Sequence, residues 1–91
     1  MVDPHHPMLM RNDGTYSIGS CDSETMAIYL NDKINKKLLK KVLCHEIVHA
    51  TIFSYGIELS VEDEEFIADL IAKHGNEIIK LTDRLFNQFK K

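Results

Sequence analysis

The chain contains no tryptophan and only two cysteines, two prolines and four glycines among its 91 residues. Two cysteines, Cys21 and Cys44, are too few for the disulfide framework that stabilises many small secreted proteins. No stretch has the length and apolar character of a membrane span or a secretory signal. We therefore expect a protein of the reducing cytoplasm.

A strong excess of charge is also absent, because 11 basic and 14 acidic residues give a formal net charge of −3. This balance argues against a general nucleic-acid-binding surface and makes a nucleic-acid partner an unfavoured expectation. Positive charge is nevertheless concentrated in five lysines, which we expect to form a solvated helix face and which leave a phosphate or acidic partner open. These are Lys33, Lys36, Lys37, Lys40 and Lys41.

Length and composition predict one domain spanning residues 1–91. Hydrophobic residues make up 44% of the chain, enough for a single modest core. Residues 1–10, with both prolines, are expected to be an irregular N-terminal arm. His5 and His6 lie in this arm, and we interpret them as a mobile surface pair, although histidines at such a place could reach a metal.

The most specific motif is His45-Glu46-Ile47-Val48-His49. On a helix, residues four apart share a face, so His45 and His49 can direct ring nitrogens at one metal ion. Neutral imidazole suits Zn²⁺, and Glu46 beside the metal could accept a proton from water that the metal activates. This pattern is the signature of zinc-dependent peptidases.

The flanks of the motif predict the helix that it requires. Apolar residues and the two histidines recur at three- or four-residue steps on one face: Leu38, Val42, His45, His49 and Ile52. We expect a helix over about residues 34–55. Asn31, Asp32 or Asn35 can cap its start, and Gly56 can take the left-handed turn at its end.

A catalytic zinc site needs a third protein ligand, and the sequence after residue 56 offers acidic candidates. Ser60 followed by acidic residues predicts a second helix that Gly75 closes. Glu65 and Asp69 lie four residues apart on it, in a strip of short or acidic side chains. One carboxylate could bind zinc while the other accepts the N–H of a ligand histidine.

Glu65 is the favoured third ligand, but the neighbouring acids cannot be separated from it by pattern alone. A rotation of the helix by one residue would exchange Glu65 with Glu64, and Glu62 and His74 also remain open. Cys44 directly precedes the motif but lies about 100° around the helix from His45, so we expect it to pack rather than to bind zinc.

Extended structure is expected before the motif and a further helix after it. Gly14–Cys21 and Met26–Leu30 read as two strands joined by the polar connector 22–25. One of these strands is a candidate edge for binding an extended peptide. The apolar residues of 76–91 predict a third, amphipathic helix that completes the core.

The zinc motif together with Glu65-Phe66-Ile67-Ala68-Asp69 resembles the gluzincin branch of the zincin metallopeptidases. More narrowly, residues 14–72 are similar to compact phage and mobile-element metallopeptidases of the ImmA/IrrE type. The resemblance implies that His45 and His49 are zinc ligands, Glu46 the catalytic base, Glu65 the third ligand and Asp69 the residue that supports a ligand histidine.

The chain departs from that family in two respects. The segment 50–64 between the second histidine and Glu65 is short, which leaves no room for a separate substrate subdomain. No downstream histidine or tyrosine clearly serves to stabilise an oxyanion, and Tyr55, the nearest tyrosine, reads as a packing residue. Activity could therefore be weak, narrow or absent.

These observations predict an α+β domain in which a small antiparallel β-hairpin or sheet precedes three helices and zinc lies between the first two. The leading hypothesis is a zinc-dependent metallopeptidase that hydrolyses peptide bonds in a peptide or protein substrate. The first alternative is a zinc-binding interaction module of phage or mobile-element origin, with weak or no activity, whose metal site His74 or Cys44 closes. The second is a nucleic-acid-associated factor that uses the five lysines. Substrate and oligomeric state stay open.

Overall fold

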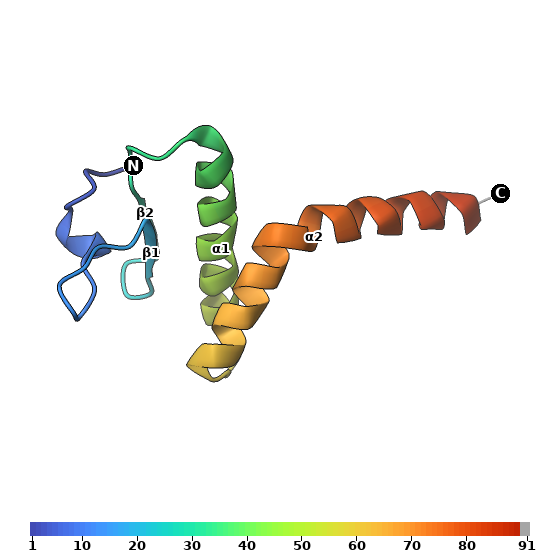
Figure 1. The fold of residues 1–91 in the computed structure, drawn as a ribbon. Coiled ribbons are helices and arrows are strands. Elements are labelled where there is room, and N and C mark those ends of the chain that lie inside the picture. Colours follow the sequence, from blue (N-terminus) through green and yellow to red (C-terminus); the bar gives the residue numbers. More distant parts are fainter. Residues whose placement is uncertain (90–91) are drawn as a thin grey trace.

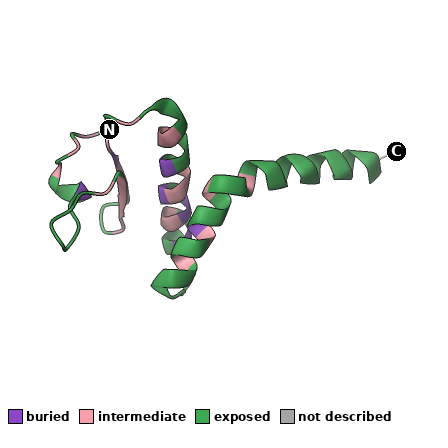
Figure 2. Cartoon of the chain, in the orientation of Figure 1, coloured by how far each residue is buried: buried purple, intermediate pink, exposed green. Residues whose placement is uncertain are grey.

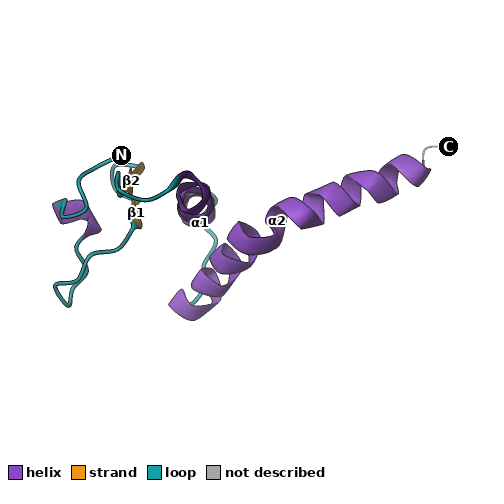
Figure 3. Ribbon diagram, turned by 45° about the horizontal axis from the view of Figure 1, so that its top comes forward, coloured by secondary structure: helices purple, strands orange, loops and turns teal. Residues whose placement is uncertain are grey.

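The computed structural model describes residues 1–89 and has a mixed α+β fold. A 3-10 turn, Pro7–Leu9, comes first. A β-hairpin of β1 (Gly19–Asp22) and β2 (Ala27–Leu30) follows, and then come the helices α1 (Lys36–Ser54) and α2 (Val61–Phe89). Helix α1 stands between the hairpin and the first half of α2 (Figures 1 and 3).

The two strands form an antiparallel sheet in which Gly19 is opposite Leu30. The expected antiparallel hairpin is confirmed, but its first strand is shorter than 14–21. Residues 15 and 17 direct their backbone hydrogen bonds elsewhere. Thr15 receives the N–H of Arg11 at 2.7 Å, and the N–H of Ser17 donates to the carbonyl of Leu9 at 2.8 Å. These groups are therefore not available to extend the pairing with β2.

The N-terminal residues lie against this hairpin. The N–H of Val2 donates to the carbonyl of Leu30 at 2.7 Å, and the carbonyl of Val2 accepts from Asp32 at 2.8 Å. Leu9 is 1% exposed, the most buried large side chain of the described residues. The ring of His6 stacks on Tyr29 with centroids 5.4 Å apart. Residues 1–10 thus contribute to the core on the far side of the hairpin from α2.

Helix α1 has the ends that the sequence predicts. The side chain of Asn35 accepts the N–H of Leu38 at 2.9 Å and so caps the first turn. Gly56 follows the helix with a positive φ of 63°, a conformation that glycine adopts without steric cost.

The prediction of three helices is wrong, because α2 runs without interruption from Val61 to Phe89. Its start is as expected, with the hydroxyl of Ser60 accepting the N–H of Asp63 at 3.1 Å. Gly75 does not close it and lies within the helix, with no positive φ. An interior glycine costs roughly 1 kcal/mol relative to alanine. That cost is too small to end a helix that contains no proline.

The small core lies between α1 and the first half of α2, where Val48 and Ile52 pack with Ala68. Ala68 has no exposed surface, and its small side chain lets the two helices approach closely. The second half of α2 extends away from the rest of the molecule and is exposed along its length (Figure 2). Within residues 1–89, neither helix has the length and apolar character needed to cross a membrane.

Candidate metal centre

The two motif histidines meet on one face of α1. Their Nε2 atoms are 3.1 Å apart, and their ring planes are inclined at 64°. The side chains of His45 and His49 are 23% and 17% exposed. Both rings are therefore held in place by their surroundings while one edge of each stays accessible.

Glu65 reaches both histidines from α2. Its Oε2 atom is 3.2 Å from Nε2 of His45, and its Oε1 atom is 3.0 Å from Nε2 of His49. Tetrahedral zinc with bonds of about 2.0–2.1 Å would hold its ligand atoms about 3.3 Å apart. The two nitrogens and the carboxylate thus have nearly the spacing of three ligands around one ion.

A second carboxylate lies behind each histidine. Oδ1 of Asp69 is 3.2 Å from Nδ1 of His45, and Oε1 of Glu64 is 3.0 Å from Nδ1 of His49. A carboxylate can only accept a hydrogen bond, so a neutral ring that donates to Asp69 or Glu64 carries its proton on Nδ1, and one that donates to Glu65 carries it on Nε2. A metal ion at the centre would select the first arrangement. Both Nε2 atoms then present bare lone pairs, which is the tautomer that a metal requires.

This proton arrangement tests whether a metal fits. In the tautomer that a metal requires, two unprotonated Nε2 atoms and the carboxylate of Glu65 would face one another at 3.0 to 3.2 Å. Lone pairs that converge in this way repel each other unless a cation lies among them. A divalent ion bound by His45, His49 and Glu65 would remove the repulsion, so the donor set fits zinc.

The electrostatics of the site favour positive charge. Burial lowers the pKa of His49, but the hydrogen bond to Glu64 and the charges of Glu65 and Glu46 outweigh it and raise that pKa. The same negative environment would stabilise a bound cation. Burial raises the pKa of Glu46, an effect that the nearby histidines only partly offset.

Glu46 is the one buried charged residue of the described chain, with 7% of its surface exposed. Its Oε2 atom is enclosed and has no hydrogen-bond partner within residues 1–89. One of its oxygens lies within 4.8 Å of ring nitrogens of both histidines. An unpaired buried carboxylate oxygen is costly unless a ligand uses it, so this atom is suited to accept a proton from a molecule bound at the centre.

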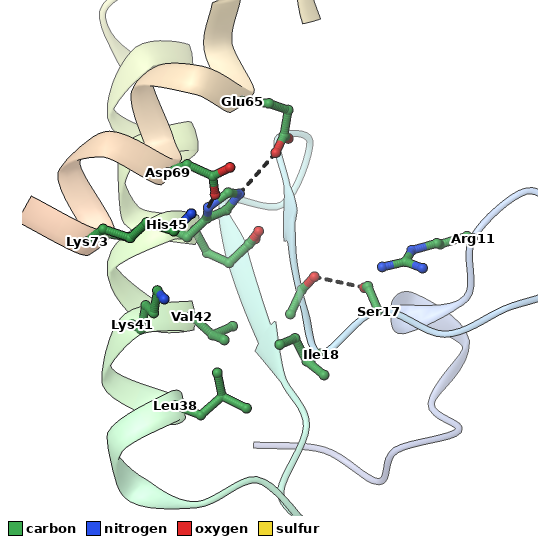
Figure 4. Close-up of a pocket in the computed structure, with 13 residues that line it drawn as sticks. Arg11, Ser17, Ile18, Leu38, Lys41, Val42, His45, Glu65, Asp69 and Lys73 are labelled. Atoms are coloured by element: carbon green, nitrogen blue, oxygen red, sulfur yellow. Dashed lines mark hydrogen bonds and ion pairs between the residues drawn. The ribbon is translucent and has the colours of Figure 1, made fainter. Parts of the chain in front are cut away.

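An open groove runs past the centre between β1 and the two helices. One cavity of about 540 Å³ includes His45 in its wall, and an adjoining cavity of about 490 Å³ includes His49. Glu46 and Glu65 line both cavities. Figure 4 shows Glu65 beside the first. The candidate metal centre therefore lies midway along the groove.

The free edge of β1 faces this groove. The N–H of Asn31 donates to the carbonyl of Ile18 at 3.0 Å, and hydrogen-bonded pairs alternate along an antiparallel ladder. The backbone groups of Gly19 and Cys21 consequently point away from β2, and both residues line the groove. Of the two strands considered for an exposed edge, β1 is the one beside the centre.

Other candidate residues are not brought to the centre. His74 is exposed, and its Nδ1 atom lies 3.7 Å from Oε2 of Glu77 on the same helix. Cys44 lines a different cavity, together with Lys37, Lys40 and Lys41 of α1. Glu62 is exposed in the first turn of α2 and forms no ion pair with the described residues. Tyr55 is 79% exposed, which contradicts its interpretation as a packing residue.

Some features of the site were not evident from the sequence. Glu64 was considered only as an alternative ligand, whereas here it supports His49 from behind. Arg11 and Ser17 line both cavities, but nothing in their sequence context indicates this. Gly19 could have been suspected, since a glycine in a strand often marks a close approach of backbone.

Comparison of the chain with protein-family models, with curated proteins and with solved structures finds no match.

Proposed function

We propose that the protein is a zinc-dependent metallopeptidase. The observation that supports this proposal best is the convergence of His45, His49 and Glu65 at distances of 3.0 to 3.2 Å, with both Nε2 atoms facing the carboxylate. The free thiols of Cys21 and Cys44 suit the reducing cytoplasm that we propose as its compartment.

In this proposal His45, His49 and Glu65 hold the ion, while Asp69 and Glu64 keep the two imidazoles oriented. Bound zinc supplies a Lewis acid that polarises a carbonyl and lowers the pKa of water. Glu46 accepts the proton of the attacking water and passes it to the leaving amine. A pKa raised by burial suits both steps, because the carboxyl group must hold the proton between them.

The substrate in this proposal is an extended peptide that pairs with β1. Within the described part of the chain, the backbone groups of Cys21 and the N–H of Gly19 are free on this edge and can bind a peptide by strand addition, whereas the carbonyl of Gly19 accepts a hydrogen bond of 2.8 Å from the hydroxyl of Ser17. Because Gly19 has no side chain, β1 can approach α1 closely. A Cβ atom at this position would lie 2.6 Å from Cγ1 of Val42. A peptide on this edge would pass Glu46.

The test combines metal analysis with a peptide cleavage screen. Purified protein is expected to contain about one zinc per chain and to cleave a subset of a proteome-derived peptide library. Glu46→Gln should retain the zinc and lose turnover, whereas Glu62→Gln, an exposed acid on α2, should change neither. Bound zinc without cleavage of any peptide would refute the enzymatic proposal, and full activity of Glu46→Gln would refute the role of Glu46.

A second candidate is a zinc-binding interaction module without activity. The observation that favours it is that no histidine or tyrosine other than His45 and His49 lines the two cavities beside the centre, within residues 1–89. Such a residue would stabilise the developing oxyanion. A protein that contains zinc, cleaves nothing and captures a specific protein partner through the β1 edge would support this alternative.

A further inference from the structure

The larger cavity of the groove continues beyond the metal centre along α1. From His45 it extends past Val42 to Leu38, which lie one and two helical turns earlier on the same face. Ile18 closes this part from the side of the hairpin (Figure 4). The cavity thus has a metal-binding end and an apolar floor that could receive one side chain of a peptide.

Three cationic side chains line the same cavity. Lys41 precedes His45 by one turn on α1, Lys73 follows Asp69 by one turn on α2, and Arg11 approaches from the loop on the opposite side (Figure 4). None of the three forms an ion pair with another residue of the described chain. Arg11 donates a long hydrogen bond of 3.5 Å to the hydroxyl of Thr15. Hydrogen bonds from Thr15 lower the pKa of the exposed Asp13, and the charge of Arg11 adds to this effect.

The acidic residues of the same cavity lie at the proposed metal centre. Glu65 contacts both motif histidines, Asp69 contacts His45, and Glu46 is buried beside them. Negative charge is therefore gathered at one end. Charges at an open rim are partly screened by solvent, but three positive charges along one cavity can still favour a ligand of negative charge.

We propose that this part of the groove binds a carboxylate of the substrate, with Arg11, Lys41 and Lys73 as the residues that recognise it. The inference depends on the proposed peptidase function and specifies which peptides are preferred. A glutamate side chain has an apolar stem for the floor formed by Leu38 and Val42 and a charged end for the cations. A free chain terminus next to an apolar residue would offer the same chemistry.

The experiment compares three peptides of otherwise identical sequence, taken from a cleaved member of the library or, if none is cleaved, from a member that binds the zinc-loaded protein. The first has glutamate next to the scissile bond and an amidated terminus, and the second has glutamine there and an amidated terminus. The third has glutamine and a free terminal carboxylate adjacent to that position. Preference for the first identifies a side-chain carboxylate, and preference for the third identifies a terminal one.

The variants Lys41→Glu and Lys73→Glu test the cations, each with a control on its own helix. Lys36→Glu and Lys80→Glu place the same change on α1 and α2 outside the cavities that flank the centre. We expect kcat/KM for the preferred carboxylate peptide to fall about tenfold in each test variant, which corresponds to about 1.4 kcal/mol. For the amidated glutamine peptide, kcat/KM should change less than about twofold. The two control variants should match the wild type with every peptide.

Binding is measured separately, so that the two proposals can fail independently. Fluorescence anisotropy with zinc-loaded Glu46→Gln reports affinity for the three peptides without cleavage. If no peptide is cleaved by the wild type but binding still favours a carboxylate and loses this preference on Lys41→Glu, the carboxylate site stands and the peptidase proposal fails. Equal affinity and equal cleavage of all three peptides would overturn the carboxylate site and leave the peptidase proposal intact.

Discussion

Gly19 on β1 lies directly against Glu46 on α1, and the contact leaves no space for a larger residue. A Cβ atom at position 19 would be 3.3 Å from Cγ of Glu46 and 2.6 Å from Cγ1 of Val42. Strand and helix are therefore as close here as backbone and side chain allow. This contact sets the distance between the free edge of β1 and the carboxylate that we propose as the catalytic base.

The first prediction follows from this contact. Gly19→Ala should lower the free energy of unfolding by about 1–3 kcal/mol, the usual cost of forcing extra volume into a packed region. Urea unfolding followed by circular dichroism measures the change. Ser23→Ala, in the connector between the strands, is the control and should leave stability nearly unchanged. An equally stable Gly19→Ala protein would show that β1 does not approach α1 this closely.

The second prediction separates the two adjacent acids of α2. Glu65→Ala removes a proposed ligand and should reduce zinc affinity more than Glu64→Ala, which removes only the support of His49. A lost supporting residue typically costs about 10- to 100-fold in metal affinity. Competition with a chromogenic chelator measures both affinities. A larger loss for Glu64→Ala would identify Glu64 as the ligand.

The third prediction tests Asp69, which contacts His45 as Glu64 contacts His49. Asp69→Asn keeps the size of the side chain but can turn an N–H toward Nδ1 of His45, where a proton acceptor is needed. Zinc affinity should fall by about 10- to 100-fold. Asp83→Asn, on the distant half of α2, should bind zinc as the wild type does. An affinity unchanged by Asp69→Asn would mean that the contact with His45 does not orient the ring.

The fourth prediction concerns stability, because the proposed ligands come from two helices. Zinc at about 100 times its dissociation constant should stabilise the fold by about 2.7 kcal/mol, provided that the unfolded chain does not bind it. Thermal unfolding with and without a chelator measures the effect. A variant with His45→Ala and His49→Ala should show the same Tm under both conditions. A Tm of the wild type that does not respond to the chelator would contradict a metal shared by α1 and α2.

Much of the site could be predicted from the sequence, because its ligand spacing depends on local geometry. A helix with Asn35 as its cap fixes where His45 and His49 point, and the sequence contains both the cap and the apolar face. The roles of Glu64 and Glu65 depend instead on the rotation of α2 against α1. Packing around Ala68 sets that rotation, and periodicity determines it only to within about one residue.

The groove could not be predicted, because its wall is built by residues remote in sequence. Arg11 reaches the centre only because the N-terminal residues fold against the hairpin, with Leu9 buried there. No periodic pattern marks such a loop. The number of helices was missed for a different reason. Glycine is common just after a helix and occurs less often within one. The presence of Gly75 therefore does not show by itself whether a helix ends there.

Gly75 therefore provides the last prediction, a test of whether α2 is one helix. In a continuous helix Gly75→Ala should raise the free energy of unfolding by up to about 1 kcal/mol, since alanine has the higher helix propensity. The added Cβ would lie 3.1 Å from Cγ2 of Ile71, an exposed side chain that can shift to make room. Chemical denaturation and helical circular dichroism measure the result. If Gly75 instead ended a helix in a left-handed conformation, alanine would be strained there, and the same substitution would destabilise the protein by roughly 1 kcal/mol.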